Sequence, residues 1–172
     1  MKKTLEVNTL AHLYTIREFL PDMIKLNKGH VVTISSMAGT MALPGIADYS
    51  ASKFGAFAID EALRLEMKKN KKNIKTTCIC PYYINTGMFE GVKNSWHTPI
   101  LDQKWVVWRI LTAVRQEEPV VLMPWSGNLT FIFRGILPTW LGDGISSLLG
   151  YTTSMDSFKG RQEHGPQPSK RE

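Results

Sequence analysis

The chain alternates between two hydrophobic patterns, one typical of amphipathic helices and one typical of short buried strands. Apolar positions at helical spacing predict helices over about 4–27, 47–70 and 102–116. Short runs rich in β-branched residues predict strands over 30–36, 74–80 and 119–124, followed by apolar helical pieces. Strands that alternate with helices indicate an α/β fold with parallel strands.

Composition is that of an ordinary globular protein. The 172 residues are 43% hydrophobic and 21% charged, enough for one domain with a core. No internal repeat or secretory signal peptide is visible, since Lys2 and Lys3 precede a mixed segment. The apolar stretch 129–142 is shorter than the ~20 residues of a membrane span. Its pattern fits a pocket lining, a segment lying in a membrane interface or plain core packing.

The net charge of +6 has a local source in the cluster 68–75, at the predicted end of a helix. Cations there suit the helix dipole, so a solvated helix end is favoured. We expect no nucleic-acid site, because no aromatic residues interleave with these charges. An anionic membrane surface is an intermediate alternative.

Cysteine and histidine positions do not predict a metal. Cys78 and Cys80 alternate with Ile79 in an apolar strand, so we expect both on one sheet face as core groups rather than a bridge. The four histidines lack the spacing of metal ligands, and surface or local hydrogen-bonding roles are expected of them: His12, His30, His97 and His164.

The segment 36–53 carries the candidate chemistry. Ser36 follows a predicted strand, and ligands of open α/β sheets bind outside the carboxyl ends of the strands. Tyr49 and Lys53 lie one helical turn apart, so both side chains emerge from one face. A nearby ammonium favours the phenolate, so we expect Lys53 to lower the pKa of Tyr49. Ser36 could donate a hydrogen bond to an oxygen that gains charge.

These residues resemble the short-chain dehydrogenase/reductase family, in which a serine precedes the tyrosine of a Tyr-x-x-x-Lys motif by the separation between Ser36 and Tyr49. The family also has an asparagine on the preceding helix, and Asn8 matches it. The resemblance implies that Tyr49 transfers a proton, Lys53 holds ribose hydroxyls and Ser36 orients the carbonyl. It implies that Asn8 positions a water in the relay, and that the cofactor is NAD or NADP.

The segment 81–88 resembles the family's contact to the nicotinamide amide. By this resemblance Ile84 contributes its backbone and Thr86 its hydroxyl, after Pro81. The family usually has glycine where this chain has Tyr82. The substitution removes freedom for positive φ and adds bulk near the cofactor.

Three segments, 19–23, 80–91 and 155–161, are most similar to the membrane-associated branch of retinol and 17β-hydroxysteroid dehydrogenases. This resemblance implies a small lipophilic alcohol or carbonyl substrate, either a retinoid or a hydroxysteroid. It also implies a location at the endoplasmic reticulum membrane or the lipid-droplet surface, on the cytosolic face.

The glycine-rich βαβ half of a dinucleotide fold has no counterpart in these residues. We therefore expect the C-terminal portion of a Rossmann-like doubly wound parallel sheet, with a partial catalytic domain over 1–161 and a polar, disordered tail over 162–172. In the family order the three strands are neighbours, so strand 30–36 should expose an open edge that invites association. The first helix should expose Leu10, Leu13, Ile16 and Leu20.

Two classes of function follow. The first is an NAD(P)-dependent oxidoreductase built on Asn8, Ser36, Tyr49 and Lys53. The second is a catalytically inactive, truncated family member that binds a lipid surface or a protein, including a second copy of itself, through its exposed edge.

Overall fold

The computed structural model describes residues 1–88, 91–92 and 99–158. Expectations for Phe89, Glu90, His97 and His164, for 159–161 and for the tail 162–172 lie outside the described residues. Three strands, β1 (Gly29–Ile34), β2 (Ile74–Pro81) and β3 (Val120–Met123), form a parallel sheet in the order β1-β2-β3. The predicted α/β class with parallel strands is therefore confirmed.

The helices lie within a few residues of their predicted bounds. The first is a continuous helical stretch of α1 (Lys2–Leu5), the π-helical turn η1 (Glu6–Leu10) and α2 (Ala11–Leu26). Helix α2 is capped by Asn27, which adopts a left-handed φ of 49°, a conformation that asparagine tolerates well. The others are α3 (Ala47–Lys69) and α4 (Gln103–Arg115).

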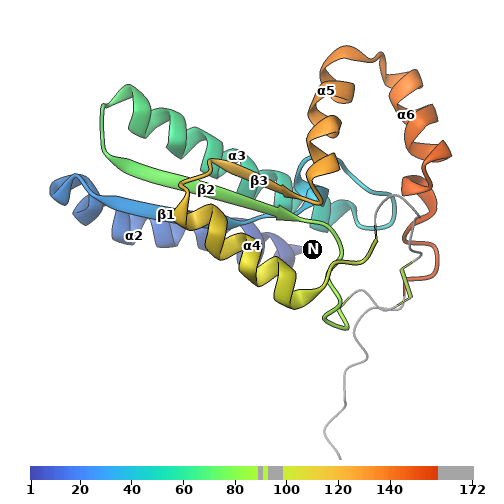
Figure 1. Ribbon diagram of the computed structural model, residues 1–172, viewed down its shortest axis with the longest axis horizontal. Coiled ribbons are helices and arrows are strands. Elements are labelled where there is room, and N and C mark those ends of the chain that lie inside the picture. Colours follow the sequence, from blue (N-terminus) through green and yellow to red (C-terminus); the bar gives the residue numbers. More distant parts are fainter. Residues whose placement is uncertain (89–90, 93–98, 159–172) are drawn as a thin grey trace, which may run out of the picture.

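Helices cover the two faces of the sheet (Figure 1). Helix α3 lies along one face and α4 along the other, where it packs on β2. Helix α2 packs against both β1 and α3. Residues of β2 and β3 form the centre of the core, with Ile79, Cys80 and Met123 almost fully buried. As predicted, Cys78 and Cys80 are free and buried, with their Sγ atoms 3.8 Å apart.

The first helical stretch is less exposed than its sequence suggests. Leu10 and Leu13 are exposed, as expected. Ile16 and Leu20 are not: they pack against a cluster formed by Leu63, Met67 and Ile74. The expectation for those two residues was wrong because the α2 face that carries them turns toward α3 and β1.

Strand β1 forms one edge of the sheet. Among the described strands it pairs only with β2, so its other edge has no strand partner there. Val32 and Ile34 point away from α3 and are 38% and 45% exposed. The predicted open edge is therefore present in the described part of the chain.

The C-terminal helical pieces lie beyond the carboxyl ends of the strands. They are η3 (Trp125–Asn128), α5 (Leu129–Ile136), α6 (Thr139–Leu148) and η4 (Tyr151–Thr153). Figure 1 shows α5 and α6 as a hairpin that rises above the sheet and returns through η4. Within the described ranges, no helix combines the length and the apolar character needed to cross a membrane.

Candidate active site

Ser36, Tyr49 and Lys53 line one cavity of about 270 Å³ at the carboxyl end of β1. Ser36 follows the strand and caps the 3-10 turn η2 (Met37–Gly39), where its Oγ accepts a hydrogen bond from the Ala38 N–H at 3.1 Å. Tyr49 and Lys53 come from the first turns of α3. The Lys53 Nζ lies 5.9 Å from the centre of the Tyr49 ring and donates to the Ile34 carbonyl at 3.0 Å.

The electrostatics of Tyr49 differ from the sequence-based expectation. Burial raises the pKa of the Tyr49 phenol, and a hydrogen bond with the Ser36 side chain opposes the rise. The expected lowering by Lys53 is not found: burial is the largest influence, and it raises the pKa of Tyr49. Burial also lowers the pKa of Lys53. The phenol is therefore held in its protonated form at neutral pH.

Short polar contacts stabilise the start of α3, and one of them joins it to the end of β1. The Ser35 hydroxyl donates to the Lys53 carbonyl at 2.8 Å, and the Ser52 hydroxyl donates to the Tyr49 carbonyl at 2.7 Å. Gly39 allows a close approach, since a Cβ there would lie 2.5 Å from the Lys53 carbonyl oxygen. Sequence reasoning missed these three supporting residues, although two are serines adjacent to predicted site residues.

Asn8 lies beside the site rather than in it. It belongs to the π-helical turn η1, and its side-chain amide donates to the Ser52 hydroxyl at 3.1 Å. The neighbouring Thr9 hydroxyl donates to the Ser52 carbonyl at 2.8 Å. Asn8 is thus brought to α3 between Tyr49 and Lys53, but it is not among the residues that line the cavity.

Two histidines make local interactions. His12, on α2, is half-buried, and burial together with the Lys53 charge lowers its pKa. His30 shares a hydrogen bond of 2.8 Å between its Nε2 and the Thr77 hydroxyl. The sequence offered no sign that His12 lies near Lys53.

The segment after β2 completes the cavity wall. Ile84 and Thr86 line it, and the Thr86 N–H donates to the Ile84 carbonyl at 2.7 Å. Pro81 is not among the residues that line the cavity, but its carbonyl accepts a hydrogen bond from the Ser36 hydroxyl at 3.4 Å. Tyr82 needs no positive φ, and its N–H donates to the Met123 carbonyl at 2.7 Å. Its ring lines the cavity, as its bulk suggested.

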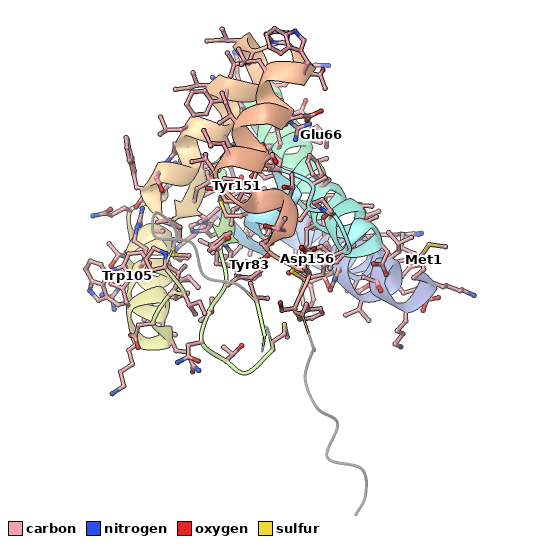
Figure 2. All side chains as sticks on the ribbon, turned by 90° about the vertical axis from the view of Figure 1, so that its right-hand side faces the viewer. Met1, Glu66, Tyr83, Trp105, Tyr151 and Asp156 are labelled. Atoms are coloured by element: carbon pink, nitrogen blue, oxygen red, sulfur yellow. The ribbon has the colours of Figure 1, made fainter. Side chains whose placement is uncertain are left out.

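A second, larger cavity of about 900 Å³ adjoins the first. Its walls come from the loop 41–44 and from η3, α5, α6 and η4. It shares three lining residues with the smaller cavity: Met37, Leu43 and Tyr82. Figure 2 looks onto this end of the molecule, with Tyr83 and Tyr151 in its middle.

The apolar stretch 129–142 divides its side chains between this cavity and solvent. Leu129, Phe133 and Leu137 line the larger cavity. Ile136 and Trp140 are strongly exposed, each at 74%. Pocket lining is thus one role of the stretch.

The arrangement is suited to chemistry at an oxygen atom. Two hydroxyls, one of them on a phenol that retains its proton, face the same cavity as an ammonium group. Such a set can donate hydrogen bonds to a carbonyl oxygen and exchange a proton with it.

Comparisons with known proteins identify the family to which this chain is similar. The family model for short chain dehydrogenases matches residues 1–96. Epidermal retinol dehydrogenase 2 of Homo sapiens is 42% identical over 161 residues, which cover 92% of this chain and 52% of that protein. Estradiol 17-beta-dehydrogenase 11 of Macaca fascicularis is 39% identical over 139 residues, covering 80% of this chain and 46% of the relative.

Solved structures share the fold. A short chain dehydrogenase from Burkholderia cenocepacia in complex with NADP has a TM-score of 0.67 and 22% identity, covering 84% of this chain and 58% of that chain. A short chain dehydrogenase/reductase from Burkholderia phymatum in complex with NAD has a TM-score of 0.62 and 16% identity. The match covers 76% of this chain and 56% of that chain.

This chain spans about half the length of the two curated relatives. The predicted Rossmann-like fold agrees with the solved neighbours, of which this chain covers a part. Because the family model matches more than half of its residues, the chain belongs to the short-chain dehydrogenase family.

Proposed function

We propose that the protein is an NAD(P)-dependent oxidoreductase that interconverts an alcohol and a carbonyl on a lipid-like substrate. The observation that carries this proposal is the convergence of Ser36, Tyr49 and Lys53 on one cavity. The family assignment supports the reaction class, and the two relatives are named for retinol and estradiol.

The residues around the cavity fit a nicotinamide nucleotide. Lys53 offers an ammonium for ribose hydroxyls, and Thr86 a hydroxyl for the amide, both on the cavity that holds Ser36 and Tyr49. The Ile84 backbone and Pro81 complete this set. When bound, the cofactor supplies or accepts the hydride equivalent that protein side chains cannot provide. Solved neighbours hold either NADP or NAD, so both stay in the proposal.

The side chains divide the remaining work. Tyr49 donates its proton to the substrate oxygen in reduction and takes it back in oxidation. Ser36 donates a hydrogen bond to the same oxygen and stabilises its developing charge. Asn8, anchored on Ser52, orders a water that links the proton path to solvent.

The substrate we propose is a retinoid or a hydroxysteroid. The larger cavity carries mostly apolar side chains and adjoins the smaller one, which suits a greasy body with one polar end. We place the protein at the endoplasmic reticulum membrane or the lipid-droplet surface, on the cytosolic face. Exposed Trp125, Ile136 and Trp140 near the larger cavity support contact with a lipid surface.

Cofactor titration tests the proposal. The purified chain is titrated with NADH and with NADPH while nicotinamide fluorescence is followed, and retinaldehyde reduction is then measured. Lys53→Ala should weaken cofactor binding about tenfold or more, since it removes a charged hydrogen-bond donor. Tyr49→Phe should keep binding and lower kcat by about 10²–10⁴.

Lys68→Ala, at the exposed end of the same helix, is the matched control and should change neither quantity. Absence of binding at millimolar cofactor would refute independent catalysis by this chain. Equal binding by Lys53→Ala and wild type would refute the role of Lys53.

A second candidate function has one observation in its favour. The β1 edge and the exposed Val32 and Ile34 form an apolar surface on the described part of the sheet. A catalytically inactive chain could bind a protein, a second copy or a lipid surface there. Retained self-association without any cofactor binding would favour this alternative.

A further inference from the structure

We propose that Tyr82 is a specificity-determining residue that controls which carbonyl compounds reach Ser36 and Tyr49. Its ring belongs to the wall shared by the two cavities, together with Met37 and Leu43. The inference rests on the proposed function, because it concerns the substrate of that same site.

The cavity sizes favour a substrate that spans both cavities. Ligand sites usually enclose ~300–1,000 Å³. The catalytic cavity, at about 270 Å³, is smaller than that range, whereas the adjoining cavity, at about 900 Å³, lies within it. A lipid-like substrate whose body lies in the larger cavity would reach Ser36 and Tyr49 by placing its reactive end beyond the shared wall.

Tyr82 contributes the largest side chain to that wall and is held firmly. Only 8% of it is exposed, and its N–H bonds to the Met123 carbonyl across the sheet. Its ring centre lies 4.3 Å from that of Tyr83, whose hydroxyl donates to the Met155 sulfur at 3.2 Å. These contacts restrict the motion of the Tyr82 ring. The size of the ring then limits the space between the two cavities.

The other two wall residues are less suited to this selection. Met37 is already packed closely against Gly127, where a Cβ would lie 2.7 Å from its sulfur. Leu43 is fixed by its backbone N–H, which donates to the Ser50 hydroxyl at 3.3 Å. Both side chains are also smaller than that of tyrosine, so Tyr82 restricts the space between the two cavities more than they do.

Three ketones, each isotope-labelled at the carbonyl carbon, test the inference by NMR titration. Butanone fits the small cavity, methyl undecyl ketone is long and narrow, and dicyclohexyl ketone is bulky on both sides. A carbonyl that accepts hydrogen bonds from Ser36 and Tyr49 shifts downfield. In the wild-type chain, we expect this shift for butanone and methyl undecyl ketone and not for dicyclohexyl ketone.

A smaller residue at position 82 should let a bulkier ketone reach Ser36 and Tyr49, and a larger residue should exclude the long ketone. Tyr82→Gly should produce the downfield shift for dicyclohexyl ketone, whereas Tyr82→Phe should behave as wild type. Tyr82→Trp should remove the shift of methyl undecyl ketone and keep that of butanone. Leu137→Trp, which fills only the larger cavity, should weaken binding of the long ketone about tenfold.

The outcomes separate the inference from the proposed function. If dicyclohexyl ketone gives the same signal in wild type and Tyr82→Gly, or the long ketone keeps its shift in Tyr82→Trp, Tyr82 does not select substrates. If butanone shows no shift in wild type, or keeps it in Ser36→Ala and Tyr49→Phe, the proposed catalytic pair fails instead.

Discussion

At the residue scale, burial raises the pKa of the Tyr49 phenol. A hydrogen bond with the Ser36 side chain opposes this rise, and the phenol keeps its proton at neutral pH. Sequence spacing predicted that Tyr49 and Lys53 would share a helix face, and both line the cavity. It could not predict the direction of the pKa shift, because that depends on how much water the surrounding loops exclude.

This pKa shift predicts a loss of stability at alkaline pH. Below the ordinary tyrosine pKa of about 10, folded and unfolded chains both hold the proton. As pH rises further, the unfolded chain releases it first, so the free energy of unfolding falls. Urea unfolding at about pH 9 and about pH 11 should show a smaller fall for Tyr49→Phe than for wild type.

Tyr14→Phe is the matched control, since Tyr14 is an exposed residue of α2. This variant should lose as much unfolding free energy between about pH 9 and about pH 11 as wild type does. Identical falls in Tyr49→Phe and wild type would contradict the raised pKa.

At the element scale, hydrophobic periodicity located the strands and the long helices within a few residues. It did not reveal the π-helical turn Glu6–Leu10, because such turns are rare and an apolar pattern at helical spacing predicts an α-helix. That turn carries Asn8, so the contact to Ser52 was equally invisible. The close approach of η2 and α3 at Gly39 also depends on tertiary packing.

Gly39→Ala should disturb the site through this approach. The added Cβ would lie 2.5 Å from the Lys53 carbonyl and 2.6 Å from the Ser35 hydroxyl, so η2 or α3 must move. We expect a loss of about 1–3 kcal/mol of unfolding free energy. Thermal unfolding and NADH titration measure the two effects.

Gly144→Ala, in helix α6 with open space around it, provides the contrast. It should raise stability by about 0.5–1 kcal/mol because alanine favours helix. A Gly39→Ala variant as stable as wild type, with normal cofactor binding, would show that the close approach is unimportant.

At the scale of the whole molecule, the exposed apolar surface of β1 should govern solubility. Val32 and Ile34 lie on the same side of an edge strand and are partly open to solvent. Val32→Lys should reduce concentration-dependent self-association, since a charge on an edge strand opposes pairing with another chain. Sedimentation velocity over a range of protein concentrations measures this change.

Leu65→Lys is the control, because Leu65 is an exposed residue of α3, away from the sheet edge. A similar reduction by both variants would assign the effect to net charge. The sequence predicted this edge from family strand order, but it misplaced Ile16 and Leu20. Helix rotation against its neighbours is fixed only by packing, as their contacts with the cluster around Leu63 demonstrate.

The hydrogen bond from Lys53 to the Ile34 carbonyl joins the ammonium of the site to the last residue of this same edge strand. A molecule that displaces Ile34 would therefore also displace the ammonium of Lys53. If a molecule seated along β1 favours the position of Ile34 that holds Lys53, a nucleotide that needs Lys53 there must strengthen the edge contact by the same factor. Under that condition, the affinity measured at one surface would depend on the occupancy of the other.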